Sequence, residues 1–179
     1  MQKIHAIARA PEASLFFDGA RLYWLQEGRD TSWPAYSGKR EFWENKLFSV
    51  EDQSAGDGNK DKNGGPIPEG TYAVRQNEFQ IRDSSLLEVG KQALAKARGK
   101  KKGGSWPGNY ESWGDYRVWI AAKKLKHPET VGKRKDLAVH GGADPGSDGC
   151  IDLVDKMPEF ADLFRLYGRD MELRVEYPQ

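Results

Sequence analysis

The most informative stretch of this sequence is Asp136-Leu-Ala-Val-His140-Gly-Gly-Ala-Asp-Pro-Gly-Ser-Asp-Gly-Cys150-Ile-Asp-Leu153. It contains the only cysteine among the 179 residues. Its apolar run before His140 predicts a buried strand that delivers the histidine to its end. The glycines and the proline that follow predict a tight loop that brings Cys150 back toward His140. A thiol beside an imidazole is suited to nucleophilic attack on an acyl group, because the imidazole can take the thiol proton.

The loop residues have predicted roles of their own. Gly149 lets the backbone approach closely, and its N–H and that of Cys150 are candidate oxyanion donors. Ser147 can orient the loop or supply a carbonyl to the imidazole, and Gly141 opens the turn after His140. A structural interpretation stays open, because a free cysteine is often a small buried apolar residue and a histidine at a strand end is commonly a surface residue.

The pattern His-Gly-Gly followed by Gly-Ser-Asp-Gly-Cys-Ile-Asp-Leu resembles the active-site motif of the YkuD-type L,D-transpeptidases. The short spacing from His140 to Cys150 is similar to that of the compact members used as toxins by type VI secretion systems. Further stretches extend the resemblance across most of the chain: Ser37-Gly38, Gly65-Pro-Ile-Pro-Glu-Gly-Thr-Tyr72, Ser105-Trp-Pro-Gly108 and Trp113-Gly-Asp-Tyr-Arg-Val118.

The resemblance implies an α+β fold, mostly antiparallel β with a few short helices, formed by a single domain over residues 1–179. It implies that Cys150 is the nucleophile, that His140 is its base and that Ser147 supports the histidine. The implied activity is that of an L,D-transpeptidase or L,D-carboxypeptidase, with D-amino acid exchange, on the stem peptides of peptidoglycan. No cofactor is required for this chemistry.

Two positions depart from the family pattern. Asp148 stands where many members have histidine, and Asp152 stands where they have arginine. Both carboxylates would raise the pKa of the thiol, because they repel the thiolate. The arginine of the relatives also helps to fix the substrate, so this role falls to Arg117 or Arg134, or else the substrate is contacted in a different way.

Composition narrows the function classes. The net charge of +1 argues against a nucleic-acid partner, and one cysteine permits no internal disulfide. The N-terminal residues lack the apolar core of a secretory signal, and no apolar run is long enough for membrane insertion. We therefore expect synthesis in the cytoplasm and delivery to the periplasm of a target bacterium by a secretion system or by phage lysis. Secretion machinery and a cognate immunity protein are the further partners that this implies.

Periodicity predicts a β-rich chain. Asp18-Gly19 is typical of a hairpin turn, and residues 50–65 are expected to form a mobile loop. The expected strands are 14–17, 21–25, 33–36, 71–75, 79–81, 116–121, 136–140 and 171–177. The expected helices are 84–98, a helix that begins at or just after Cys150, and 158–167, which Gly168 closes. A helix N-terminus at Cys150 would lower the pKa of the thiol and offset the two aspartates.

The remaining features have two interpretations each. Trp113 can line a glycan groove together with Trp106 and Trp119, although core packing is the default for tryptophan. The basic run at residues 100–102 fits either a solvated helix end or contact with an anionic polymer. No residue spacing suggests a metal site. Two rival functions remain: another cysteine peptidoglycan hydrolase, such as an amidase or endopeptidase, and a non-enzymatic wall-binding domain.

Overall fold

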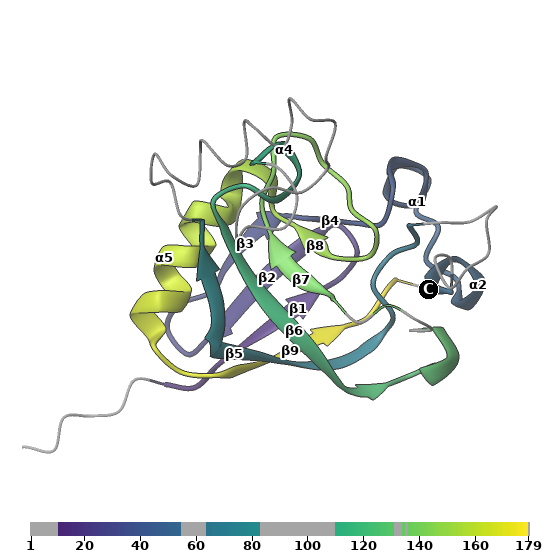
Figure 1. Ribbon diagram of the computed structural model, residues 1–179. Coiled ribbons are helices and arrows are strands. Elements are labelled where there is room, and N and C mark those ends of the chain that lie inside the picture. Colours follow the sequence, from purple (N-terminus) through teal and green to yellow (C-terminus); the bar gives the residue numbers. More distant parts are fainter. Residues whose placement is uncertain (1–10, 55–63, 83–109, 131–133, 135, 179) are drawn as a thin grey trace, which may run out of the picture.

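The computed structural model describes residues 11–54, 64–82, 110–130, 134 and 136–178 (Figure 1). The strands are β1 (Ala13–Phe17), β2 (Arg21–Gln26), β3 (Thr31–Pro34), β4 (Tyr36–Ser37), β5 (Gly70–Ile81), β6 (Tyr116–Leu125), β7 (Ala138–His140), β8 (Ile151–Asp152) and β9 (Met171–Val175). The α-helices are α1 (Arg40–Glu44), α2 (Val50–Gln53), α4 (Tyr110–Trp113) and α5 (Met157–Tyr167), and the 3-10 helices are η1 (Pro128–Thr130) and η2 (Val154–Lys156). No helix in the described ranges is long and apolar enough to cross a bilayer.

All the strands belong to one mixed sheet in the order β3-β2-β1-β9-β5-β6-β7-β8-β4. Only Ala35 separates β3 from β4, which are the two outermost strands, so the sheet curls until its edges meet and is nearly barrel-shaped. Most neighbouring pairs are antiparallel, as predicted. The pairs β1–β9 and β7–β8 are parallel, so the sheet is mixed rather than purely antiparallel.

The core lies inside this curved sheet and is closed by α5, which runs along one side of the strands in Figure 1. Phe160 and Phe164 of α5 are fully buried, and Phe160 packs edge-on against Trp24 and Trp33. The helix ends as predicted at Gly168, which has the left-handed conformation (φ 66°) that a C-terminal glycine adopts readily. Helix α5 therefore fixes one face of the strands that carry the site.

Side-chain alternation assigns the two faces of the central strands different roles. Val118, Val139 and Ile151 lie opposite one another on β6, β7 and β8, and all three are buried in the core. Their sequence neighbours Arg117 and His140 point to the other face of the sheet. Above that face Figure 1 places α4 and the loop that follows β7. The same strands thus build the core with one face and the candidate site with the other.

Several sequence predictions are confirmed and three are wrong, one of them the loop expected over 50–65, since its first residues form helix α2. The hairpin at Asp18-Gly19 and the strand over 116–121 are present, and β9 alternates between buried and exposed residues. The two strands expected at 71–75 and 79–81 are one strand, β5, with an irregular register against β6 between Val74 and Phe79. The segment after Cys150 is a short strand, not a helix. The helix predicted over 84–98, the basic run, Trp106 and most of the loop over 50–65 lie outside the described residues.

Candidate active site

A row of polar side chains crosses the sheet from β5 to β8. Gln80 pairs with Arg117, Arg117 pairs with His140, and His140 pairs with Asp152. Cross-strand partners share a face of a sheet, so these side chains line up on the face turned away from the core. Arg117, His140 and Asp152 are 4%, 2% and 0% exposed. The row brings together one cation, one imidazole and one carboxyl group that water barely reaches.

His140 is held in one orientation by its neighbour. Its Nδ1 lies 2.8 Å from the carbonyl oxygen of Gly141, and a carbonyl only accepts, so Nδ1 carries the proton and Nε2 is the unprotonated nitrogen of the neutral ring. The pKa of His140 is lowered to about 4, mainly by burial and to a smaller extent by the nearby Arg117, although the Gly141 bond opposes both effects. The imidazole is therefore neutral at neutral pH, as a general base must be.

Cys150 directly precedes β8, and its thiol is turned toward the backbone of β7. Its Sγ lies 3.7 Å from the carbonyl oxygen of Asp136 and bonds to the backbone of Ala138, two residues before His140. Among the described residues, the thiol and the imidazole share no hydrogen bond.

The protonation state of Cys150 differs from the sequence prediction. Burial raises the pKa of the thiol to about 12, and Asp148 and Asp152 raise it as their charges predicted. We expected a helix N-terminus at Cys150 to lower this pKa, but α5 begins only at Met157 and strand β8 and the 3-10 helix η2 intervene. The resting group is therefore a protonated thiol.

The loop that holds Cys150 is fixed by two serines. The Ser147 hydroxyl donates to the carbonyl oxygen of Cys150 at 2.7 Å and accepts from the N–H of Gly149 at 3.3 Å. The buried Ser37 hydroxyl accepts from the N–H of Ile67 and lies 3.5 Å from the Gly149 carbonyl oxygen. Ser147 thus stabilises the cysteine loop, while Gly141 orients the histidine. Because the Gly149 N–H is engaged by Ser147, it would have to exchange that bond to stabilise an oxyanion.

Asp152 was identified from the sequence only as a charge beside the thiol, and the structure places it beside His140. Its Oδ1 lies 3.9 Å from Nδ1 of His140. The N–H groups of Val154 and Gly146 donate to its two oxygens at 2.8 and 3.1 Å. Burial raises the pKa of Asp152 to about 7, and the two backbone bonds oppose that rise. The sequence signal was its position two residues after the cysteine, but its place beside His140 follows from the pairing of β7 with β8.

Arg117 lies between two aromatic rings on the site face. Its guanidinium carbon is 4.4 Å from the ring centre of Trp119 and 5.3 Å from that of Trp113. Trp113 also packs against His140, with 4.8 Å between ring centres. Burial lowers the pKa of Arg117 to about 10, so it remains a cation at neutral pH. The structure therefore brings Arg117 and Trp113 to His140, as a substrate-binding role requires.

Arg134 has a different environment. Its guanidinium donates to four backbone carbonyl oxygens, those of Gln53, Gly65, Pro66 and Thr130. These carbonyls belong to segments far apart in the sequence, so Arg134 joins them beside the cysteine loop. A methyl group at Gly149 would come within 2.7 Å of Nη1 of Arg134. These contacts indicate that Arg134 supports the loop that carries Cys150.

The glycines after His140 allow close packing under α4. A side chain at Gly142 would meet the Glu111 carbonyl oxygen at 2.8 Å, and one at Gly141 would meet the Val154 carbonyl oxygen at 2.7 Å. The N–H of Ala143 donates to the same Glu111 carbonyl at 2.7 Å. Gly142 therefore lets helix α4 lie directly on the loop, with Trp113 against the imidazole, whereas Gly141 allows the segment at the start of α5 to approach closely.

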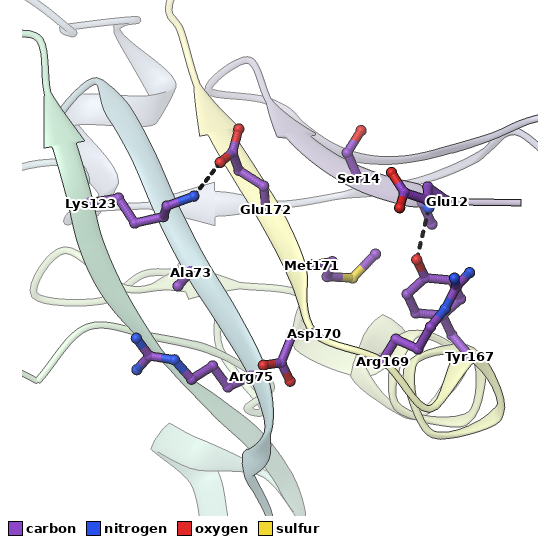
Figure 2. A pocket seen from close by; sticks show the side chains of 11 residues that line it. Glu12, Ser14, Ala73, Arg75, Lys123, Tyr167, Arg169, Asp170, Met171 and Glu172 are labelled. Atoms are coloured by element: carbon purple, nitrogen blue, oxygen red, sulfur yellow. Dashed lines mark hydrogen bonds and ion pairs between the residues drawn. The ribbon is translucent and has the colours of Figure 1, made fainter.

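A groove of about 660 Å³ lies elsewhere, on strands β1, β5, β6 and β9 (Figure 2). Lys123 of β6 spans it to form an ion pair of 2.6 Å with Glu172 of β9. Lys123 is six residues beyond Arg117 on the same strand, or about 20 Å along it. The groove is thus separate from the thiol. Within the described ranges, no group of three or more His, Cys, Asp or Glu side chains is placed to hold a metal ion.

Several solved structures are similar to this chain in fold. The chain is similar to Bd1075 of Bdellovibrio bacteriovorus, with a TM-score of 0.52 and 15% identity over 96% of this chain and 50% of that one. It is also similar to L,D-transpeptidases from Xylanimonas cellulosilytica (TM-score 0.47, 14% identity, 94% and 62% covered) and Mycobacterium smegmatis (0.40, 15%, 93% and 59%). The chain therefore spans 50–62% of the length of these proteins. No protein-family model and no curated protein matches the sequence.

Proposed function

We propose that this chain is a cysteine-dependent enzyme that modifies the stem peptides of peptidoglycan, as an L,D-transpeptidase or L,D-carboxypeptidase with D-amino acid exchange. The observation that carries the proposal is the hydrogen bond from Nδ1 of His140 to Gly141, which makes Nε2 the unprotonated nitrogen that can act as a base. The Cys150 thiol contacts the backbone of Ala138 on the same strand, two residues before that histidine. The resemblance of the loop to the transpeptidase motif adds the substrate class.

In the proposed reaction, the neutral His140 accepts the thiol proton while the sulfur attacks the carbonyl of the third stem residue. The new carbon–sulfur bond gives a thioester when the bond to the terminal D-alanine breaks. His140 returns the proton to the leaving amine. Water, a free D-amino acid or the amine of another stem then resolves the thioester. The thiol is protonated at rest, so proton transfer and attack are coupled in this scheme rather than starting from a stored thiolate.

Arg117 is the group that we propose for the carboxylate of the stem peptide. It is a buried cation on the same face as His140, and it is positioned by Gln80 and two indole rings. A guanidinium pairs with a carboxylate through two parallel hydrogen bonds. Arg134 engages backbone carbonyls, so we assign it to the support of the Cys150 loop rather than to the substrate.

The direct test is to incubate purified tetrapeptide muropeptides with the protein and to analyse the products by mass spectrometry. We expect loss of terminal D-alanine, or its exchange for an added D-amino acid, with the wild type and neither with Cys150→Ala. Cleavage of the bond between glycan and peptide, or of the cross-link, would identify an amidase or endopeptidase instead. Continued D-alanine loss with Cys150→Ala would refute cysteine catalysis.

One observation favours a second candidate, a wall-binding domain without catalysis. Cys150 is buried and its pKa is raised to about 12, as for a structural cysteine. Labelling of the native protein separates the two functions. Under this second candidate, iodoacetamide would react with Cys150 at the same rate in the wild type and in His140→Ala, whereas a base at His140 makes the wild type faster.

The delivery route belongs to the same proposal. We infer that the chain acts as an antibacterial effector in the periplasm of a target bacterium, carried there by a secretion system and neutralised in the producer by an immunity protein. The basis is the short His-to-Cys spacing, which is similar to that of the effector members of the family.

A further inference from the structure

We propose that Asp152 is a positioning residue that stabilises the protonated form of His140 and ties it to the loop that carries Cys150. The inference rests on the proposed roles of Cys150 and His140. It adds a third side chain to the pair, one that the resemblance does not supply. Its basis is the parallel register of β7 and β8, which sets Asp152 directly opposite His140.

The carboxyl group is held on both sides by backbone donors. The N–H of Val154 donates to Oδ1 and the N–H of Gly146 donates to Oδ2. Val154 is a β-branched residue with a positive φ of 49°, a conformation that such residues rarely adopt. The backbone therefore takes up an unfavourable conformation at the residue that donates to Asp152. Gly146 lies in the loop between His140 and Cys150, so Asp152 links that loop to β8.

The negative charge of Asp152 can stabilise the imidazolium that forms during the proposed reaction. When Nε2 of His140 accepts the thiol proton, an imidazolium forms in a site that is buried and faces the Arg117 cation. Both conditions oppose that charge. Oδ1 of Asp152 lies 3.9 Å from Nδ1, which is close enough to offset it. The same carboxylate disfavours a free thiolate, so it favours transfer of the proton to His140 during attack over earlier loss of that proton to water.

Other ionisable groups surround the pair and must be considered in any titration. The groups on the elements around it are Arg117 of β6, Tyr36 of β4, Cys150 and Asp148 of the loop, Asp155 of η2, and Arg134. Removal of the thiol by Cys150→Ala eliminates the group whose ionisation would be confused with that of His140. Asp155 is exposed, so Asp155→Asn removes an equal charge nearby without touching the buried pair.

The experiment is a titration of His140 by ¹⁵N NMR of the imidazole in the Cys150→Ala protein, with Asp152 and with Asp152→Asn. We expect the proton on Nδ1 in the neutral form. Asp152 takes up a proton near pH 7, so with this carboxyl group present we expect the His140 signals to respond already at that step. In Asp152→Asn this response should be lost, and the midpoint of the His140 signals should fall by at least about one pH unit, a tenfold change. Asp155→Asn should leave it unchanged. Equal midpoints with Asp152 and with asparagine, or a neutral imidazole protonated on Nε2, would overturn the proposal.

A second measurement needs no change at residue 152 and covers the case in which Asp152→Asn does not fold. In the Cys150→Ala protein, the ¹³C shift of the Asp152 carboxyl and the ¹⁵N shifts of His140 should show a common step. Two fully separate steps would contradict the pairing.

Activity is the independent readout. If the proposed function holds, Asp152→Asn lowers kcat about tenfold with little change in KM. A shifted titration without activity in any variant would retain the pairing and remove the proposed function.

Discussion

Gln80 lies directly opposite Arg117 in the β5–β6 pair, and its side-chain oxygen accepts hydrogen bonds from Nε at 2.8 Å and from Nη2 at 2.5 Å. An amide is neutral, so Gln80 orients the guanidinium without cancelling its charge. A carboxylate at the same place would form an ion pair and compete with an anionic ligand. The arrangement fits a cation that is prepared to receive a carboxylate.

Substitution of Arg117 tests this assignment. Arg117→Lys should lower kcat/KM on tetrapeptide stems by about tenfold or more, since a charge-assisted hydrogen bond contributes about 1.5–3 kcal/mol and lysine cannot form two in parallel. Arg75→Ala, which removes an exposed arginine of β5, is the matched control and should have no effect. Unchanged kinetics of Arg117→Lys would place the substrate carboxylate elsewhere.

Arg134 should behave differently in the same assay and in a denaturation experiment. Arg134→Lys loses most of the bonds to four carbonyl oxygens, because an ammonium is a point charge without a planar fork. We expect its free energy of unfolding to fall by about 2 kcal/mol or more, as measured in urea. A substrate-binding role for Arg134 would instead appear as a raised KM with unchanged stability.

The sequence predicted the local elements of this fold well and the long-range pairing poorly. The hairpin at Asp18-Gly19 and the helix that ends at Gly168 depend on turn and cap residues, and these are adjacent in the sequence. The parallel pairing of β1 with β9 joins segments from opposite ends of the chain, and that of β7 with β8 is made across the loop between them. No periodicity within one segment carries that information.

The same reason explains the errors at the site. The segment after Cys150 was expected to be a helix, but Ile151 and Asp152 pair with β7, and this tertiary pairing prevails over local preference. The predicted nucleophile and base do come to neighbouring strand positions. The contacts of Asp152 with His140 and of Gln80 with Arg117 could not be predicted, since each arises from cross-strand register.

The thiol of Cys150 should be protonated throughout the neutral range. Its raised pKa of about 12 predicts little thiolate absorbance at 240 nm below about pH 9. The measurement is the difference spectrum between wild type and Cys150→Ser, which cancels the absorbance of the aromatic residues. A thiolate step below pH 7 would mean that the protein stores an ion pair and that burial does not dominate.

The buried His140–Asp152 pair predicts how stability depends on pH. The pKa of His140 is lowered from 6.5 to about 4, so this residue destabilises the fold as the pH falls through that interval. The pKa of Asp152 is raised from 3.8 to about 7, so this residue destabilises the fold as the pH rises through its own interval. The two effects oppose each other between about pH 4 and 6.5, where the pair holds one proton both folded and unfolded.

Asp152→Asn should expose the contribution of the histidine. Its free energy of unfolding should fall by about 3 kcal/mol more than that of wild type between pH 6.5 and pH 4, from a shift of about 2.5 units at about 1.36 kcal/mol per unit. Urea unfolding at a series of pH values measures this, and the double variant with His140→Ala should remove the difference. Parallel pH curves for wild type and Asp152→Asn would contradict it.

Gly149 should be intolerant of a side chain for two separable reasons. Its φ of 111° is strained for any other residue, and a methyl group would lie 2.7 Å from Nη1 of Arg134. Gly28 also has a positive φ but open space around it, so Gly28→Ala measures backbone strain alone, about 1 kcal/mol. Gly149→Ala should cost about 3 kcal/mol or more and slow the enzyme. Equal costs at the two positions would show that Arg134 moves aside freely.

The compartment in which the protein acts is the last prediction. The proposed substrate lies outside the cytoplasmic membrane, so production in the cytosol of a Gram-negative host should be nearly harmless. Fusion to a secretory signal should cause swelling, division defects or lysis. The single cysteine permits no internal disulfide, so the fold requires neither a reducing nor an oxidising compartment. Viable counts and cell shape for wild type and Cys150→Ala, each with and without the signal, measure the effect. Only the exported wild type should be toxic, whereas equal toxicity of its cytosolic and exported forms would indicate a cytosolic target and exclude the wall as the site of action.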